Sequence, residues 1–168
     1  GEECGAVQLV GSSCETHVLE KSRVTERDAN ERNFHIFYQL LATNGYFRES
    51  IWKRLGDTDC SSFKYIGKNR RGLINGEPDS EHFKHTLKAI KTMGMDNENI
   101  CTLFRAICVV LQLGNLTFGP DGPNYDGRGS TVTSPDELEA LSEILGVPLP
   151  DIATALTVCV VTMGTEVF

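Results

Sequence analysis

Hydrophobic and polar residues follow a helical period along most of this chain, and the clearest case lies near its start. Four large apolar side chains are spaced at i, i+3, i+4 and i+7, on one stripe of a helix: Phe34, Phe37, Tyr38 and Leu41. Before them, Asp28 and Glu31 form a variant of the capping box, and Asn44 and Gly45 supply a stop signal. The pattern predicts a helix over residues 31–41 that is buried on most sides.

The same period predicts further helices along the rest of the chain. They are expected at residues 47–55, 78–93, 96–113, 134–145 and 151–156. The helix after Asp96 is apolar nearly all round, with Phe104, Ile107 and Leu111 in strict spacing, so it should be central. We expect it to pack against the preceding helix as an antiparallel pair.

The helix after Ser134 carries a complete start signal. Ser134 is the expected N-cap, Pro135 lies in the first turn, and Glu137 can reach back to the cap. Gly146 is the expected stop. The predicted inner face consists of Leu138, Leu141 and Leu145.

Short extended segments separate these helices. They are predicted at residues 6–10, 14–19, 63–66, 115–118 and 158–162. Residues 119–129 form a loop rich in glycine and proline that is too polar to bury. The chain therefore reads as mainly α, or α+β, with strands near both ends.

Composition narrows the class of protein. The 168 residues are 40% hydrophobic and 23% charged, as in ordinary globular domains. The net charge of −7 argues against nucleic acid or an anionic membrane as partner, and no apolar run reaches the ~20 residues that would insert into a bilayer. One basic cluster is either a solvated loop or a docking patch: Lys64, Lys68, Arg70 and Arg71.

The cysteines and the chain ends bear on the cellular setting. None of the 6 cysteines forms a CxxC pair, and several lie in apolar runs, which indicates reduced thiols in a cytosolic protein. Because the chain begins at Gly1 and stops at Phe168 within a strand-like run, we expect a fragment of a longer protein.

No catalytic motif is visible in the sequence. Gly67 and Lys68 lack the other residues of a phosphate-binding loop. His82 and His85 have a spacing that could hold a metal, but no further ligand is evidently placed, so a solvent-facing pair and no metal site are expected. His35, between aromatic residues, is expected to be mostly buried.

Several of these segments resemble the myosin motor head. Residues 18–24, VLEKSRV, and residues 31–41, ERNFHIFYQLL, resemble its LLEKSRV and ERNFHIFYQLL motifs very closely. Residues 103–118 are similar to the family pattern IFRILAAILHLGNIxF, and residues 79–83 also fall where myosins have them. The resemblance weakens after Leu138.

The resemblance implies that the chain is one part of a larger motor protein. Residues 1–168 would be part of the upper 50-kDa subdomain of a P-loop NTPase-type motor head, with edge strands of the central transducer sheet at the N-terminus and no complete independent domain. The family's phosphate-binding loop and switch I would precede this chain, and switch II would follow it. The parent would be an actin-activated ATPase that binds ATP and Mg²⁺, whereas this piece alone would bind neither and hydrolyse nothing.

The resemblance also implies partners and sites. The parent would move along actin filaments in the cytoplasm, with light chains or calmodulin on a neck outside this chain. The loop expected near actin, or else a variable surface, carries Asp121, Asp126 and Arg128. A charged cluster either couples the sheet to the nucleotide site or is a structural ion-pair group: Glu20, Lys21 and Arg23. The alternative is a non-enzymatic binding or scaffold protein derived from a myosin-like head.

Overall fold

A computed structural model shows how the chain folds. It describes residues 8, 10–13, 15, 20–26, 31–67, 73–120, 129–159, 162–163 and 166–167. The α-helices in this part are α1 (Ser22–Thr25), α2 (His35–Leu41), α3 (Gly45–Ile51), α4 (Asp79–Thr92), α5 (Asn97–Asn115), α6 (Pro135–Leu145) and α7 (Leu149–Thr157). Two 3-10 helices follow α3, η1 (Lys53–Asp57) and η2 (Cys60–Ser62). The described helices are too short or too polar to cross a membrane.

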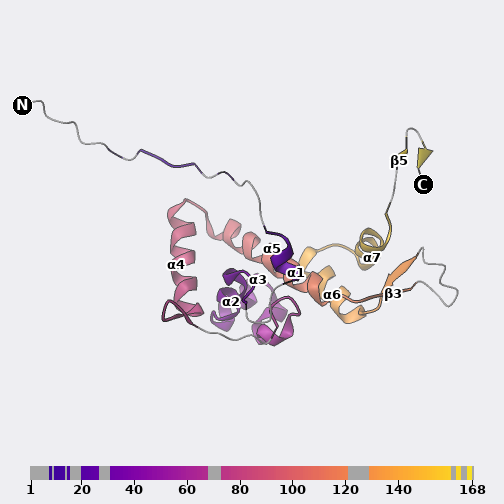
Figure 1. The fold of residues 1–168 in the computed structure, drawn as a ribbon, viewed down its shortest axis with the longest axis horizontal. Coiled ribbons are helices and arrows are strands. Elements are labelled where there is room, and N and C mark those ends of the chain that lie inside the picture. Colours follow the sequence, from indigo (N-terminus) through magenta and orange to yellow (C-terminus); the bar gives the residue numbers. More distant parts are fainter. Residues whose placement is uncertain are drawn as a thin grey trace, which may run out of the picture.

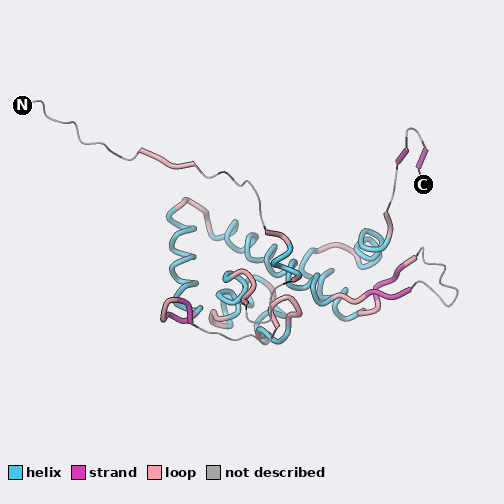
Figure 2. The backbone as a smooth tube through the Cα atoms, viewed as in Figure 1, coloured by secondary structure: helices cyan, strands magenta, loops and turns pink. Residues whose placement is uncertain are grey.

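The strands are short and form antiparallel pairs. These are β1 (Leu73–Ile74) with β2 (Glu77–Pro78), β3 (Phe118–Pro120) with β4 (Ser130–Val132), and β5 (Thr162–Met163) with β6 (Glu166–Val167). Figure 2 shows how far helices outweigh strands along the described backbone. The mainly helical α+β prediction is thus confirmed at this level. The strands predicted at residues 6–10 and 14–19 lie mostly outside the described residues.

Helix α5 is the central helix of the described structure. It runs from the end of α4 to α6, and α2 and α3 lie beneath it beside α4 (Figure 1). An aromatic cluster joins these helices: the Phe104 ring lies 5.7 Å from Phe47 and 5.3 Å from Phe83 between centroids. Phe104 is fully buried.

The predicted antiparallel packing of α4 and α5 is wrong. Both helices have nearly the predicted boundaries, and the Asp96 carboxylate accepts a hydrogen bond from the Asn99 amide at 2.8 Å. From the turn at Gly94, however, they diverge (Figure 1). Phe47 of α3 contacts both Phe83 and Phe104, so a third helix packs in the angle between them.

The start of α2 also differs from the prediction. The helix begins at His35 and not at Glu31, because the residues before it are engaged in tertiary contacts. The Asn33 side chain accepts from the Phe34 amide at 2.7 Å and donates to carbonyls of other segments. Asn44, expected as a stop, is the N-cap of α3, where its side chain accepts from the Phe47 amide at 2.9 Å.

Helix α6 begins and ends as predicted, with Ser134 in the N-cap position and Pro135 at its first residue. Gly146 has a left-handed φ of 67°, which suits a helix stop. Ser134 makes no side-chain cap; its hydroxyl accepts from the Thr117 amide at 3.0 Å. Of the three leucines expected on the inner face, Leu145 is 43% exposed, and Ala140 and Ile144 are buried instead.

The remaining extended segments were predicted only in part: Phe118 lies in β3 and Thr162 in β5, whereas residues 63–66 are not in a strand. Residues 64–67 form a turn, in which the Ile66 amide donates to the Phe63 carbonyl, and both side chains are buried. The segment after the strand predicted at residues 14–19 contains a short helix, Ser22–Thr25. Asn115 still belongs to α5, α7 extends to Thr157, and the strand near the C-terminus is Thr162–Met163.

Gly114 of α5 offers a test of this packing. A Cβ there would lie 2.6 Å from the Tyr65 ring. Although alanine is favoured over glycine in a helix by about 1 kcal/mol, overpacking costs about 1 to 3 kcal/mol. We expect Gly114→Ala to lower the free energy of unfolding in urea. Gly45→Ala is the control, since nothing lies within 4 Å of its Cβ. Equal stability of the two variants would contradict the packing.

Candidate functional site

An open groove lies where the segment before α2 meets α1 and β1. Its volume is about 540 Å³, and it is lined by Arg23, Glu31, Arg32, Asn33, Phe34, His35, Leu73 and Ile74. Most of these residues belong to the two motifs that stood out in the sequence. The groove therefore brings residues of the two motifs together.

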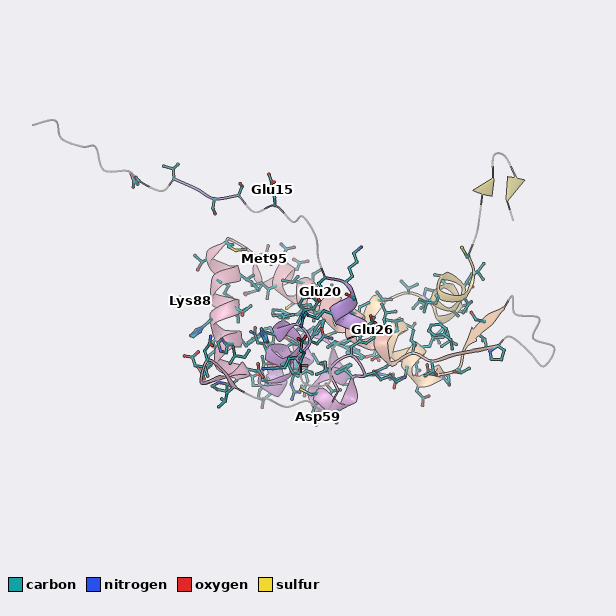
Figure 3. All side chains as sticks on the ribbon, viewed as in Figure 1. Glu15, Glu20, Glu26, Asp59, Lys88 and Met95 are labelled. Carbon is teal, nitrogen blue, oxygen red and sulfur yellow. The ribbon has the colours of Figure 1, made fainter. Side chains whose placement is uncertain are left out.

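Arg23 connects α1 to the segment that leads into α2. Its Nε donates to the Glu20 carboxylate at 2.7 Å, and its Nη1 donates to the Glu31 carboxylate at 3.0 Å. These hydrogen bonds raise the pKa of Arg23 above its ordinary value. Figure 3 shows Glu20 where the chain enters α1. Lys21 lies exposed beside it. Of the predicted charged cluster, the structure thus joins Glu20 and Arg23.

Asn33 is the buried centre of the groove wall, with 2% of its surface exposed. Its side-chain amide donates to the Val24 carbonyl at 2.9 Å and to the Tyr65 carbonyl at 2.8 Å. Its own backbone amide donates to the Tyr38 hydroxyl at 3.1 Å. One side chain thereby connects α1, the start of α2 and the turn at residues 64–67.

Arg32 forms a second connection, to the first turn of α4. Its Nη2 donates to both carboxylate oxygens of Asp79, at 2.8 and 2.9 Å, and both side chains are 11% exposed. The guanidinium carbon also lies 3.9 Å from the centroid of the Tyr38 ring, a cation–π contact. A charge-assisted hydrogen bond from which most solvent is excluded is stronger than the same bond exposed to water.

His35 lies at the rim of the groove. It is exposed and not mostly buried as predicted. Partial desolvation, followed by the positive charge of Arg32, lowers the pKa of His35 below its ordinary value. The neutral imidazole is therefore its dominant form near pH 7.

The other predicted residues are placed as follows. Asp121, Asp126 and Arg128 lie outside the described residues, between β3 and β4. Five of the apolar residues singled out from the helical pattern are buried: Phe37, Tyr38, Leu41, Phe104 and Leu111. Phe34 and Ile107 are half-buried against that cluster.

Sequence reasoning missed a buried polar network between α5 and α6. The Gln112 side chain donates to the Glu137 carboxylate at 2.6 Å, and the Asn115 side chain donates to the Ser62 carbonyl at 2.8 Å. Asn115 also accepts from the Lys64 amide at 3.0 Å. The available signal was the presence of two amide side chains in an otherwise apolar helical run, because buried polar groups need partners.

A group that could hold a metal ion lies outside the groove. Glu77, His82 and His85 offer ligand atoms within 4.8 Å of one another. The histidine pair was noted in the sequence, but Glu77 was not. The His82 side chain is 22% exposed, so this pair does not simply face solvent.

The described lining of the groove is dominated by side chains that hold neighbouring segments together. Arg23 and Arg32 are each bound by carboxylates of this chain. Asn33 bonds both α1 and the turn at residues 64–67, Arg23 bonds Glu20 and Glu31, and Arg32 bonds α4, so the three side chains tie the start of α2 to its neighbours.

Comparison with known proteins gives a consistent match. The family model for the myosin head (motor domain) matches residues 4–168. The chain is 34% identical over 140 residues to "Myosin type-2 heavy chain 1" of Schizosaccharomyces pombe, covering 83% of this chain and 9% of that protein. It is 34% identical over 142 residues to "Myosin-2 heavy chain, non muscle" of Acanthamoeba castellanii, with 83% and 9% covered. It is also 30% identical over 150 residues to "Chitin synthase 8" of Mycosarcoma maydis, with 89% and 7% covered.

Proposed function

We propose, since the chain belongs to the myosin head (motor domain) family, that it is part of an actin-based motor that couples hydrolysis of Mg-ATP to movement. The observation that carries this proposal is the match over residues 4–168. The chain spans 9% of the length of the two myosin heavy chains compared above. We therefore assign ATP-driven movement to a longer protein of which this chain is a part.

Within that protein, we assign the chain to the upper 50-kDa region. ATP and Mg²⁺ would be bound by a phosphate-binding loop and switches supplied by other segments, and this chain alone would turn over no ATP. A mechanical role for the groove is supported by Arg32 and Asn33, which bond segments that lie 47 and 32 positions away in the sequence, and by Arg23, which bonds α1 to the segment before α2. Such a linkage can pass a movement near the nucleotide to the helices of this region.

The partners follow from the same proposal. The motor would bind actin filaments and belong to the actin cytoskeleton, with light chains or calmodulin on its neck. Asp121, Asp126 and Arg128 are the candidates for contacts with actin. Glu20, Lys21 and Arg23 are the candidates for coupling to the nucleotide site.

Substituting Arg23 in the whole motor tests the coupling role. Arg23→Gln removes the bonds to Glu20 and Glu31. Because coupling energies of about 1 to 2 kcal/mol correspond to roughly 5- to 30-fold effects, we expect actin-activated ATP turnover to fall about that much, with ATP affinity unchanged. Arg54→Gln, in an exposed pair with Glu143, is the control. Full actin activation in Arg23→Gln would refute the coupling role and leave the motor assignment intact.

A second function is favoured by one comparison. A protein named a chitin synthase is 30% identical to this chain, so similar sequence occurs outside proteins named as myosins. The alternative is a scaffold or binding protein built on a myosin-like head. Sequencing the parent transcript decides first: if it encodes neither a phosphate-binding loop nor switch II, the motor proposal fails. ATP binding with actin-stimulated turnover by the whole protein would exclude the scaffold.

A further inference from the structure

The β1–β2 hairpin and the start of α4 form a compact unit. Asn75 and Gly76 connect the strands with positive φ values of 53° and 86°, as a two-residue turn of the mirror-image type requires. The strand register pairs Ile74 with Glu77. Both residues are thereby held beside the first turns of α4, which begins two residues after Glu77.

Two histidines of α4 face this hairpin. His82 and His85 are separated by three positions, so they lie on one side of the helix. The His82 Nε2 and the His85 Nδ1 each lie 3.9 Å from the same Glu77 oxygen, Oε2. Three ligand atoms from two elements therefore converge, a juxtaposition that spacing along the sequence did not reveal.

We propose that Glu77, His82 and His85 bind one Zn²⁺ ion, a property independent of the proposed motor function. Two imidazoles with one carboxylate and an open position are a ligand set that Zn²⁺ accepts in proteins. With bonds of about 2.0 to 2.1 Å, tetrahedral geometry places ligand atoms about 3.4 Å apart. The two 3.9 Å separations must shorten by about 0.5 Å, and the separation of the two imidazole nitrogens, which is within 4.8 Å, by at most about 1.4 Å. The exposed side chains of Glu77 and His85 can make these movements while the half-buried His82 stays in place.

The surroundings favour a cation. Lys84, the positive charge of α4 nearest in sequence to both histidines, is bound to Glu81 at 2.7 Å. The chain as a whole carries a net charge of −7. The His82 Nε2 now lies 2.9 Å from the Ile74 carbonyl, so coordination through this atom replaces that hydrogen bond with a metal bond.

Both flexible ligands can be removed without touching the core. Glu77 and His85 are exposed, with side chains 51% and 66% accessible, so Glu77→Gln and His85→Ala should fold normally. Glu98→Gln is the matched control, because it removes an exposed carboxylate in the first turn of α5, outside the cluster, and leaves the Lys84–Glu81 pair intact. Far-UV circular dichroism of each variant verifies folding.

Cobalt is the spectroscopic probe, with Zn²⁺ as competitor. Titration of the 168-residue chain with Co²⁺ should give one equivalent of d–d absorbance, no thiolate charge-transfer band, and loss of the signal when Zn²⁺ is added. We expect Glu77→Gln and His85→Ala to weaken binding at least about tenfold, since even supporting residues of metal sites contribute that much. Glu98→Gln should bind like the unaltered chain.

Three results would overturn the proposal. A thiolate band would assign the ion to cysteines, of which Cys60, Cys101 and Cys159 are at least partly accessible in the described residues. Unchanged affinity in folded Glu77→Gln and His85→Ala would remove the cluster from the site. Absence of any saturable cobalt signal would mean that the three side chains bind no metal.

Discussion

Replacing Asp79 with alanine is expected to lower the free energy of unfolding by about 3 to 5 kcal/mol, because it leaves the Arg32 guanidinium buried without its counter-charge. Both partners are 11% exposed, and two hydrogen bonds of 2.8 and 2.9 Å are lost together. The Nε and Nη1 atoms of Arg32 are already buried without hydrogen-bond partners in the described structure. Urea unfolding followed by tryptophan fluorescence measures the effect, since Trp52 lies in the core.

An exposed ion pair provides the control. Glu143 accepts from the Arg54 Nε at 2.6 Å, but its side chain is 42% exposed, so Glu143→Ala should cost less than about 1 kcal/mol. A cycle with Arg32→Met and the double variant separates the pair from other effects at the start of α4. Similar losses for Asp79→Ala and Glu143→Ala would show that burial does not strengthen the Arg32–Asp79 pair.

The helices of this chain could be predicted because their signals are local. The period of apolar residues and the flanking Asp96 and Gly146 place α5 and α6 to within a few residues. Their packing could not be predicted in the same way. Phe47, which comes from a third helix, contacts Phe83 of α4 and Phe104 of α5, and no local signal in the sequence indicates these contacts.

The groove was predictable only in part. Charged residues near Arg23 stood out, and the resemblance of residues 31–41 to a known motif pointed to the same place. The partners of Asn33 could not be read from the sequence, because Tyr65 lies 32 positions away. The hydrogen bonds of Asn33 to distant segments also compete with the local capping signal, and α2 therefore begins at His35.

A local signal in the sequence indicates the hairpin that brings Glu77 close to His82 and His85. Asn75 followed by Gly76 is among the strongest hairpin signals in a short sequence. Had the turn been recognised, Glu77 would have been placed opposite Ile74 and near the histidines that follow. The extended segments predicted from the sequence do not include residues 73–78, so Glu77 was not expected beside the histidines.

Phe104→Ala should destabilise the fold by about 3 to 5 kcal/mol, the usual cost of removing a buried phenylalanine and leaving a cavity. The ring is fully buried and contacts Phe47 of α3 and Phe83 of α4, so three helices lose a shared partner. Leu103→Ala is the control on the same helix, because its side chain is 38% exposed and should cost under about 1.5 kcal/mol.

Phe104→Leu distinguishes the two sources of this stability. Leucine fills much of the volume but makes no ring contact, and aromatic pairs add about 0.5 to 1.5 kcal/mol beyond the area they bury. A loss intermediate between that of Leu103→Ala and that of Phe104→Ala would show that cavity and ring geometry both contribute. A loss as small as that of Leu103→Ala for both Phe104 variants would mean that the helices close over the site, and the ring contacts of Phe104 with Phe47 and Phe83 would then contribute little to the packing of the three helices.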